Sequence, residues 1–333
     1  MSLLRVHSLG VCTSAWASID QLRHGVALFK SQGHSGPADS RHVEAGPDYA
    51  GDAAMMESLD PVSRLAISAI TQAWQLAHLD RGVVPSDRIA LLFYSAWGQV
   101  DSTMAYLESM WAEGGRFASP RHFSRSVHSS PTAMAAIHFG IHGPCQTLVH
   151  DAWPVCSALE RADDLLSVGQ ADAVVVCWAD QPASVAVDLC RRAARDLHRS
   201  QFSRFSVAPH GGAVAAVVSV NAAVPSTEFG VEIGPAAGGN KRSGTEPVVN
   251  QGPYPTDGAL HWAAAGVAWS LARPRSETLA NIAASSEVPE YWLENAHHGQ
   301  TRKIAFRRMT LQGPVQARDS GPTTEPHQDP SDE

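Results

Sequence analysis

The sequence is poor in charge, has no basic excess and has no long apolar run. Only 17% of its 333 residues are charged and the net charge is −8, which argues against a nucleic-acid-binding protein because such proteins carry a basic face. The longest apolar run, around Ala213 to Val218, is far shorter than the ~18–20 residues that span a bilayer. Arg5 and His7 interrupt the first residues, so we expect no secretory leader. These features indicate a soluble globular protein.

Cysteine is also scarce. The chain has five cysteines, at positions 12, 145, 156, 177 and 190, and no pair has C-x-x-C spacing. An odd number without a disulfide pattern fits a reducing cytoplasm. The 16 histidines lack the spacing of metal ligands, so the sequence predicts neither a metal site nor a cofactor.

What the sequence does contain is a run of strong element signals between Ser126 and Asp180. Ser130 and Pro131 open an Ala-rich helix that should close near Gly140, and a short extended run follows over Gln146 to His150. The turn after it leads to Pro154, a residue that suits the first turn of a helix because its missing N–H is not needed there. This helix has an apolar stripe formed by Val155, Ala158, Leu159, Ala162, Leu165 and Leu166. Gly169 lies where a left-handed cap would fall, and Ala173 to Cys177 predicts a strand buried on both faces.

The rest of the chain predicts further helices and strands around this region. Asp60 and Pro61 start a strong helix, as N-cap and first-turn residue. We read residues 31–57 as a surface excursion, Gly234 to Gly258 as a loop or linker with a domain boundary nearby, and Pro314 to Glu333 as disordered. The remaining predictions are strands over 3–11, 88–94, 211–220, 229–233 and 302–308 and helices over 16–28, 102–111, 183–199 and 261–271.

The central stretch resembles the β-ketoacyl synthases of fatty-acid and polyketide assembly, which have the thiolase-like fold. Their pattern is an Ala-rich helix, Gly-Pro-Ser, a strand and then Ala-Cys-Ala-Ser at the start of the nucleophile helix; this chain has Gly143-Pro144-Cys145 followed by TLVHDAWP. The family's acylated cysteine falls on Ala152, flanked by Asp151 and Trp153. The resemblance is closest to chain-length factors, which lack that cysteine. The phrase SVHSSP also resembles the SVHN(S/A)P stretch of synthase-like proteins of aryl-polyene pathways.

The resemblance covers about residues 1–235 and implies an α/β, thiolase-like layered fold with a mixed sheet. It also implies a shortened C-terminal part over 236–312, followed by a disordered tail over 313–333. The implied function is a non-catalytic subunit that supports an active ketosynthase in fatty acid, polyketide or aryl-polyene biosynthesis. The expected partners are a Cys-bearing ketosynthase, paired as a heterodimer across Gln146 to His150, and an acyl carrier protein. No residue is expected to be catalytic, since alanine offers no nucleophile.

Two alternatives stay open. In the first, the chain is a thiolase-like acyltransferase whose nucleophile has moved, and Cys156 and Cys145 are the first residues to test. In the second, it is a stand-alone acyl-binding scaffold. The bulky Trp153 either fills space near an acyl pocket or packs in the core.

Several other residues have competing interpretations. The histidine phrases that the synthase family carries in its C-terminal half are absent; the nearest match, Asn295 to Gly299, fits a polar loop better. His150 and Asp151 are adjacent on a strand and should face opposite ways. His128 lies beside Ser129 and Ser130, which is weak evidence for a Ser–His pair.

Three basic phrases stand out on this acidic chain: Arg121 to Arg125, Arg191 to Arg204 and Lys303 to Arg308. Each is either a patch that steers an acidic carrier protein or a solvated surface.

Overall fold

One mixed sheet organises the part of the chain that the computed structural model describes, which is residues 4–13, 53–95, 97–112, 118–149, 154–181, 212–220, 231–235, 248–250, 290–297 and 300–308. Its strands are β1 (Leu4–Thr13), β2 (Ile89–Ser95), β3 (Cys145–Val149), β4 (Ala173–Asp180), β5 (Gly212–Ser219), β6 (Val231–Pro235), β7 (Val248–Asn250), β8 (Glu290–His297) and β9 (Gln300–Arg308). They lie in the order β3-β2-β4-β5-β1-β6-β9-β8-β7. β2 pairs parallel with both β3 and β4, whereas β5 is antiparallel to β4 and β1.

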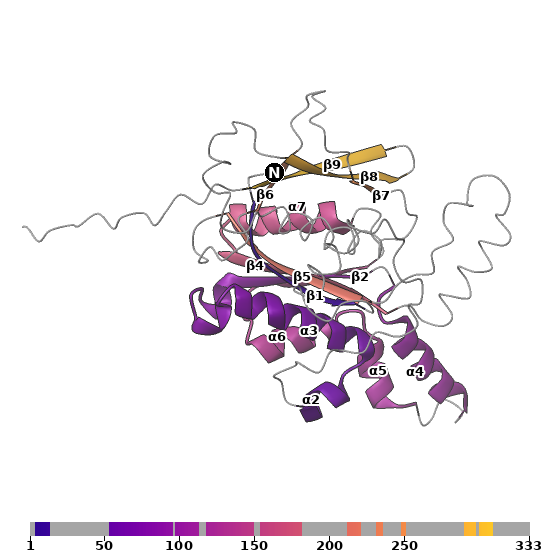
Figure 1. Cartoon of the computed structure of the whole chain (residues 1–333). Helices are drawn as coiled ribbons and strands as arrows, with labels where there is room; N and C mark the ends of the chain where they lie inside the picture. Colours follow the sequence, from indigo (N-terminus) through magenta and orange to yellow (C-terminus); the bar gives the residue numbers. More distant parts are fainter. Residues whose placement is uncertain are drawn as a thin grey trace, which may run out of the picture.

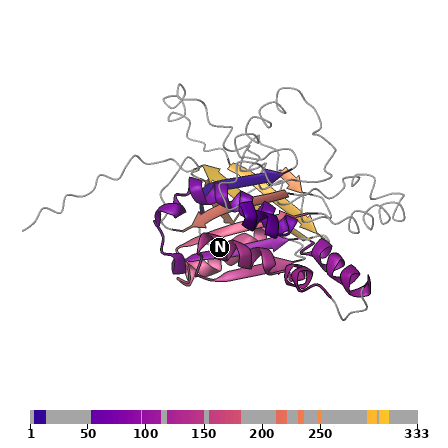
Figure 2. The same ribbon diagram turned by 90° about the horizontal axis from the view of Figure 1, so that it is seen from below.

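Helices cover both faces of the five strands β3-β2-β4-β5-β1. The described helices are α2 (Ala53–Ser58), α3 (Pro61–Leu76), α4 (Val100–Ala112), α5 (Pro120–Ser126), α6 (Ser130–Phe139) and α7 (Pro154–Ser167), with short 3-10 turns at Leu79–Arg81 and Ser86–Arg88. Figure 1 shows α7 above this sheet and α3 and α6 below it. Seen from below, α4 projects to one side of the strands (Figure 2). The predicted α/β layered fold with a mixed sheet is confirmed.

The start of α3 is determined by two adjacent residues, Asp60 and Pro61. The Asp60 side chain accepts a hydrogen bond from the Ser63 N–H at 2.9 Å, and Pro61 occupies the first helical position. This is the predicted cap, and it satisfies one of the N–H groups that a helix start leaves without a partner. The predicted stripe is buried throughout: Val62, Leu65, Ala66, Ala69, Ile70, Ala73, Trp74 and Ala77.

A hydrophobic core lies on each face of the sheet, and the same strands contribute to both because alternate side chains point to opposite faces. On the α7 side lie Ala90, Leu92, Tyr94, Val174, Val176, Trp178, Val214, Ala216 and Val218. On the α3 side lie Ile89, Leu91, Phe93, Ala173, Val175, Cys177, Ala213, Ala215 and Val217. Strands buried on both faces read as continuous apolar runs, which is why β2, β4 and β5 were predictable.

β1 breaks this alternation with a bulge. Val6 pairs with Val218 and Ser8 with Val217, so His7 is the extra residue. The bulge lets Val6 and Leu9, three residues apart, both face the α7 core. His7 is 3% exposed, and its Nε2 lies 2.7 Å from the Ser219 hydroxyl. Burial, with a smaller contribution from Arg5, lowers the pKa of His7 to about 4.

Small residues on the other face of β1 allow α3 to approach closely. The Ser8 hydroxyl donates to the Ala73 carbonyl at 2.6 Å. A Cβ on Gly10 would lie 1.9 Å from the Ala69 carbonyl oxygen. The Gln72 amide bonds the Val11 backbone at both N–H and C=O, at 3.2 and 3.0 Å. Strand and helix are therefore locked in one register.

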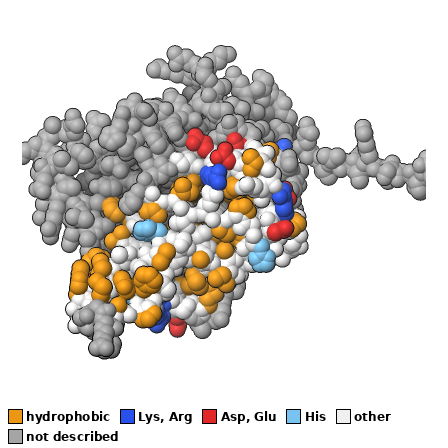
Figure 3. All heavy atoms as spheres, turned by 180° about the vertical axis from the view of Figure 1, so that it is seen from behind, with side chains coloured by type: hydrophobic (Ala, Val, Ile, Leu, Met, Phe, Trp, Pro, Cys, Tyr) orange, Lys and Arg blue, Asp and Glu red, His pale blue; other side chains and the backbone are white. Residues whose placement is uncertain are grey.

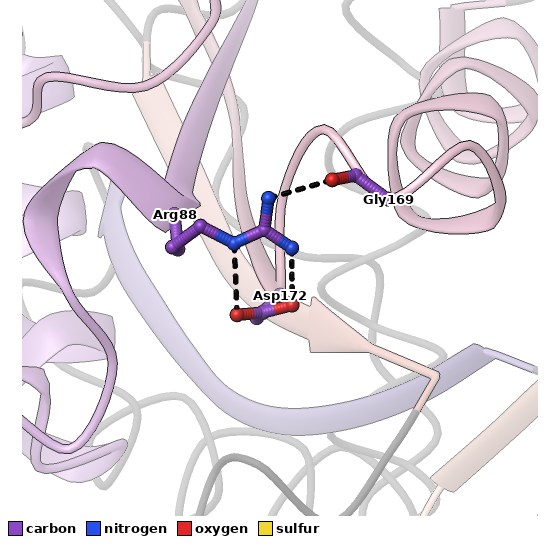
Figure 4. Close-up of polar contacts among 3 residues, drawn as sticks. All are labelled: Arg88, Gly169 and Asp172. Carbon is purple, nitrogen blue, oxygen red and sulfur yellow. Dashed lines mark hydrogen bonds and ion pairs between the residues drawn. The ribbon is translucent and has the colours of Figure 1, made fainter.

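A salt bridge ties the amino ends of β2 and β4 together (Figure 4). Arg88 Nε and Nη2 donate to the two oxygens of Asp172 at 3.0 and 2.7 Å, and Nη1 donates to the Gly169 carbonyl at 2.6 Å. Gly169 has φ +69°, as predicted for a left-handed cap after α7. The guanidinium therefore fastens the turn after α7 to the start of the sheet.

Some predictions were wrong. β8 occupies most of the predicted polar loop at Asn295 to Gly299, β7 lies inside the predicted linker, and α2 lies in the predicted surface excursion. α5 was not predicted at all. The predicted helices over 16–28, 183–199 and 261–271 and the tail lie outside the described residues. The domain boundary near 235 and the shortened C-terminal part stay predictions.

Candidate functional site

The candidate site is the connection between β3 and α7. β3 ends at Val149 and α7 begins at Pro154, so the predicted strand and the predicted helix are both present. Ala152 and its neighbours Asp151 and Trp153 lie between these bounds, outside the described residues, as does His150. The start of a helix offers N–H groups and a positive dipole end, which is where an acyl-transfer enzyme stabilises negative charge.

The two alternative cysteines lie at different distances from this connection along the chain. Cys145 is the first residue of β3, about 13 Å before Val149 at the rise of a strand. It is exposed, and its Sγ lies 3.5 Å from the Gly143 carbonyl oxygen. Partial burial raises the pKa of this thiol, which disfavours the nucleophilic thiolate. Cys156 lies in the first turn of α7.

A polar network lies at the carboxyl ends of the parallel strands β2 and β4, next to the end of β3. β2, β3 and β4 are parallel, so their carboxyl ends share one edge, where ligands bind in open α/β sheets. The Ser95 hydroxyl donates to Asp180 Oδ1 at 2.6 Å, and the Trp97 N–H donates to the same oxygen at 3.0 Å. The Gly98 N–H in turn donates to the Ser95 hydroxyl at 2.7 Å. This network fixes the segment that follows β2.

His128 is held against that segment. Its Nδ1 accepts the Gln99 N–H at 3.2 Å, so in the neutral ring Nε2 carries the proton. Gly98 has φ +60°, and a Cβ there would lie 2.3 Å from His128 Nδ1. In the described structure no hydrogen bond joins His128 to Ser129 or Ser130, the neighbours that gave only weak evidence for a Ser–His pair in the sequence.

Sequence reasoning missed Ser95, Asp180 and Gln99. Ser95 and Asp180 each end a buried strand, and polar residues in that position are a usable signal once the strands are known to be parallel. The Ser95–Asp180 contact spans 85 residues, so spacing in the sequence could not reveal it. Gln99 is 2% exposed, and its amide nitrogen has no partner in the described structure.

β3 is the edge of the sheet. Among the described strands it pairs with β2 alone. Two side-chain contacts join β3 to the helices beside it. The hydroxyls of Thr132 on α6 and Thr147 bond each other, and Arg161 Nε on α7 donates to Gln146 at 2.8 Å. In this described sheet, one row of the β3 backbone groups therefore has no pairing strand, and such a row can pair with a further strand.

The other sequence candidates fall on several elements. Arg121 and Arg125 lie on α5, Lys303 to Arg308 lies on β9, and His297 ends β8. Residues 191–204 are outside the described part of the chain. Within the described ranges, no group of three or more His, Cys, Asp or Glu side chains is placed to hold a metal ion. Of the helices described, none is long and apolar enough to cross a membrane.

This architecture is that of the thiolase-like proteins. A structure described as the ishigamide ketosynthase/chain length factor aligns with a TM-score of 0.61 at 15% identity, over 92% of this chain and 99% of that one. A type II PKS acyl-carrier protein in complex with its ketosynthase aligns at 0.63 and 12%, over 92% and 99%. The ketosynthase ApeO in complex with its chain length factor ApeC, from Xenorhabdus doucetiae, aligns at 0.57 and 13%, over 92% and 100%. At these identities the likeness establishes the fold.

The sequence also matches a family model. Residues 50–195 match the family model described as the beta-ketoacyl synthase, N-terminal domain. Residues 50–195 are therefore similar to the β-ketoacyl synthases, as the resemblance implied. The match spans α2 to β4 and includes the β3–α7 connection. No curated protein matches the sequence.

Proposed function

We propose that this chain is a non-catalytic, chain-length-factor-type subunit that supports an active ketosynthase. The observation that carries the proposal is the combination of the family match over 50–195 with alanine at position 152, in the connection where the family carries its acylated cysteine. An alanine side chain cannot form a thioester, so the acyl chain must be held by another subunit.

The edge strand supports a subunit contact. β3 lies at the end of the sheet and has one unpaired side in the described structure, and exposed edges are templates for pairing with another chain. We propose that a Cys-bearing ketosynthase pairs there, forming a heterodimer. Two of the similar structures are described as ketosynthases with chain length factors and one as a ketosynthase with an acyl-carrier protein, which supports both proposed partners.

The proposed product is a polyketide or aryl-polyene chain, with a fatty acid as the further candidate. The chain acts beside the ketosynthase and shapes the space into which the acyl chain grows. Trp153, directly after Ala152, is the residue we propose fills part of that space.

Affinity purification followed by acyl labelling tests the function. A tagged chain should bring down a Cys-bearing ketosynthase in equal amount. In that complex a radiolabelled acyl thioester, or a cysteine-directed synthase inhibitor, should label the ketosynthase and leave this chain unlabelled. Stoichiometric labelling of this chain would contradict the non-catalytic role. The variant Ala152→Cys should gain reactivity toward the inhibitor, with Ala158→Cys, a buried α7 position, as the matched control.

The relocated-nucleophile alternative predicts a different result. The chain would then take up label by itself, and either Cys156→Ser or Cys145→Ser would abolish the labelling, whichever residue is the nucleophile. A stand-alone scaffold would show neither labelling nor a ketosynthase in the purified complex.

A further inference from the structure

The helices α4 and α5 form an arm that stands away from the sheet (Figure 2). Within α4 only Ser102 is buried, and α5 has no buried residue. The side chains of Trp111 and Phe123 are 65% and 55% exposed, and Figure 3 shows hydrophobic side chains gathered at the lower left of the view, on the side where these helices lie. Core packing therefore does little to hold this α4–α5 arm against the body of the protein.

Contacts within the arm join its two helices to each other. The rings of Tyr106 and Phe123 lie 5.4 Å apart, centroid to centroid. Closer to the sheet, the Thr103 hydroxyl lies 3.4 Å from the Ser126 carbonyl oxygen. Because these contacts stay inside the arm, α4 and α5 can change their position as one body without losing them.

Two short segments connect the arm to the body, one before α4 and one between α5 and α6. The first is anchored at Gly98, whose N–H donates to the Ser95 hydroxyl at 2.7 Å, and that hydroxyl donates to Asp180. The second contains His128, whose Nδ1 accepts the Gln99 N–H at 3.2 Å. This bond, the His128 latch, joins the two segments at the base of the arm.

The latch depends on the charge of the imidazole. Nδ1 accepts a hydrogen bond only in the neutral ring; once it takes up a proton from solvent it becomes a donor, and it then faces the Gln99 N–H as a second donor. His128 is exposed, so a proton reaches the ring without unfolding. The ring also lies against Gly98, where it leaves no room for a side chain.

The side chain of Gln99 favours release of the arm. It is 2% exposed, and its amide nitrogen has no hydrogen-bond partner in the described structure. Burial of an unpartnered amide costs free energy, which is recovered when the amide reaches water. This cost opposes the latch bond, so a change of one charge can decide between a held and a released arm.

Charged side chains on the elements around the ring act in both directions. Asp101 lies in the first turn of α4 and Asp180 ends β4, and their carboxylates favour a protonated ring. Arg125 lies in the last turn of α5 and opposes protonation. Further along the two helices follow Glu108, Arg121 and His122.

We propose that the α4–α5 arm is a pH-sensitive flap that His128 holds at its base. The neutral ring keeps the flap in the position described, and protonation of Nδ1 releases it to turn about Gly98. Gly98 has φ +60°, a conformation that glycine adopts without strain and can leave as readily. The device does not depend on the subunit assignment, because it uses residues of this chain alone.

Hydrogen–deuterium exchange read by mass spectrometry, with electron-transfer fragmentation to resolve single amides, tests the flap. Rates at pH 8 and pH 5, between which histidine side chains change charge, are divided by the intrinsic rate at each pH. Protection of the Gln99 N–H should fall on the order of tenfold at pH 5. The amides inside α4 and α5 and the Gly98 N–H should keep theirs within about twofold, because their partners do not include the imidazole.

Two variants separate the latch from other acid effects. His128→Asn offers an acceptor that does not titrate, so it should retain protection of Gln99 at both pH values. His122→Asn removes a histidine from the same arm and should respond to pH as the wild type does. His128→Ala should show the low protection at pH 8 already; if it does not fold, the comparison of the wild type with His128→Asn decides.

Equal protection of the Gln99 N–H at the two pH values in the wild type would overturn the latch. A pH-dependent loss that persists in His128→Asn would assign the titration to another group and overturn it as well. Loss of protection throughout α4 and α5 would show that the arm unfolds in acid, which contradicts a flap that moves as one body.

Discussion

The buried His7 predicts a specific loss of stability in mild acid. Its imidazole is neutral in the folded protein, since burial lowers its pKa from 6.5 to about 4. The unfolded chain binds a proton there as the pH falls below 6.5, whereas the folded chain does not until pH 4. The contribution of His7 to stability is therefore complete above pH 6.5 and is lost progressively between pH 6.5 and pH 4.

The size of the effect follows from the shift in pKa. At about 1.4 kcal/mol per pKa unit, the full loss is about 3 kcal/mol, of which about 2 kcal/mol has occurred by pH 5. Urea unfolding followed by tryptophan fluorescence at pH 7.5 and pH 5 gives the two free energies of unfolding. The variant His7→Gln keeps a group that can bond the Ser219 hydroxyl but does not take up a proton, so its stability should fall by about 2 kcal/mol less than that of the wild type.

The exposed His142 provides the control. His142→Gln should lose as much stability between the two pH values as the wild type. If His7→Gln and the wild type lose the same free energy, the acid sensitivity resides in other groups and the reasoning about the bulge is wrong. Should His7→Gln not fold, Ser219→Ala serves instead: it removes the neutral ring's partner and should lower stability at pH 7.5 by about 1 kcal/mol.

Three further predictions concern the sheet. Gly10→Ala places a methyl group 1.9 Å from the Ala69 carbonyl oxygen and should cost about 3 kcal/mol or more in unfolding free energy, because neither backbone can move freely; an unchanged urea midpoint would disprove the close approach. Arg88→Lys keeps the charge but loses the two-pronged contact with its carboxylate partner, so the melting temperature should drop slightly at low and high salt alike; a drop that vanishes in high salt would indicate charge alone. Asp180→Ala removes the acceptor of two hydrogen bonds, one of them from Ser95, and should destabilise the protein by about 2 kcal/mol. Chemical denaturation would detect this loss, and equal stability of the two proteins would refute it.

The sequence predicted those elements that depend on residues close together in the chain. Asp60 and Pro61 predicted the start of α3 because the cap and the first turn use adjacent residues. Gly140, in the left-handed conformation, ends α6 as predicted. β4 was predictable because a strand buried on both faces needs apolar residues at every position.

The missed elements depend on distant partners. β8 has an apolar run of only three residues, Tyr291 to Leu293, between two glutamates, and β9 pairs with it along its whole length. α5 has seven residues, too few for a periodic pattern to show. The same reason limits how much of the candidate site could be predicted. The order of elements around Ala152 depends on neighbouring residues and was predicted, whereas the network around Asp180 joins residues far apart in the chain and was not.

The central position of β1 has a consequence for biosynthesis. Of the described strands β1 is synthesised first, yet it lies between β5 and β6, and its residue His7 bonds a hydroxyl 212 residues later. At ~5–20 residues per second, the strand waits about 10 to 40 s for that neighbour. Ser8 reaches its partner on α3 after only 65 residues. Among the described elements, α3 is therefore a partner that β1 can contact early, and we expect the close packing around Gly10 to keep the apolar strand covered while the rest of the chain is synthesised.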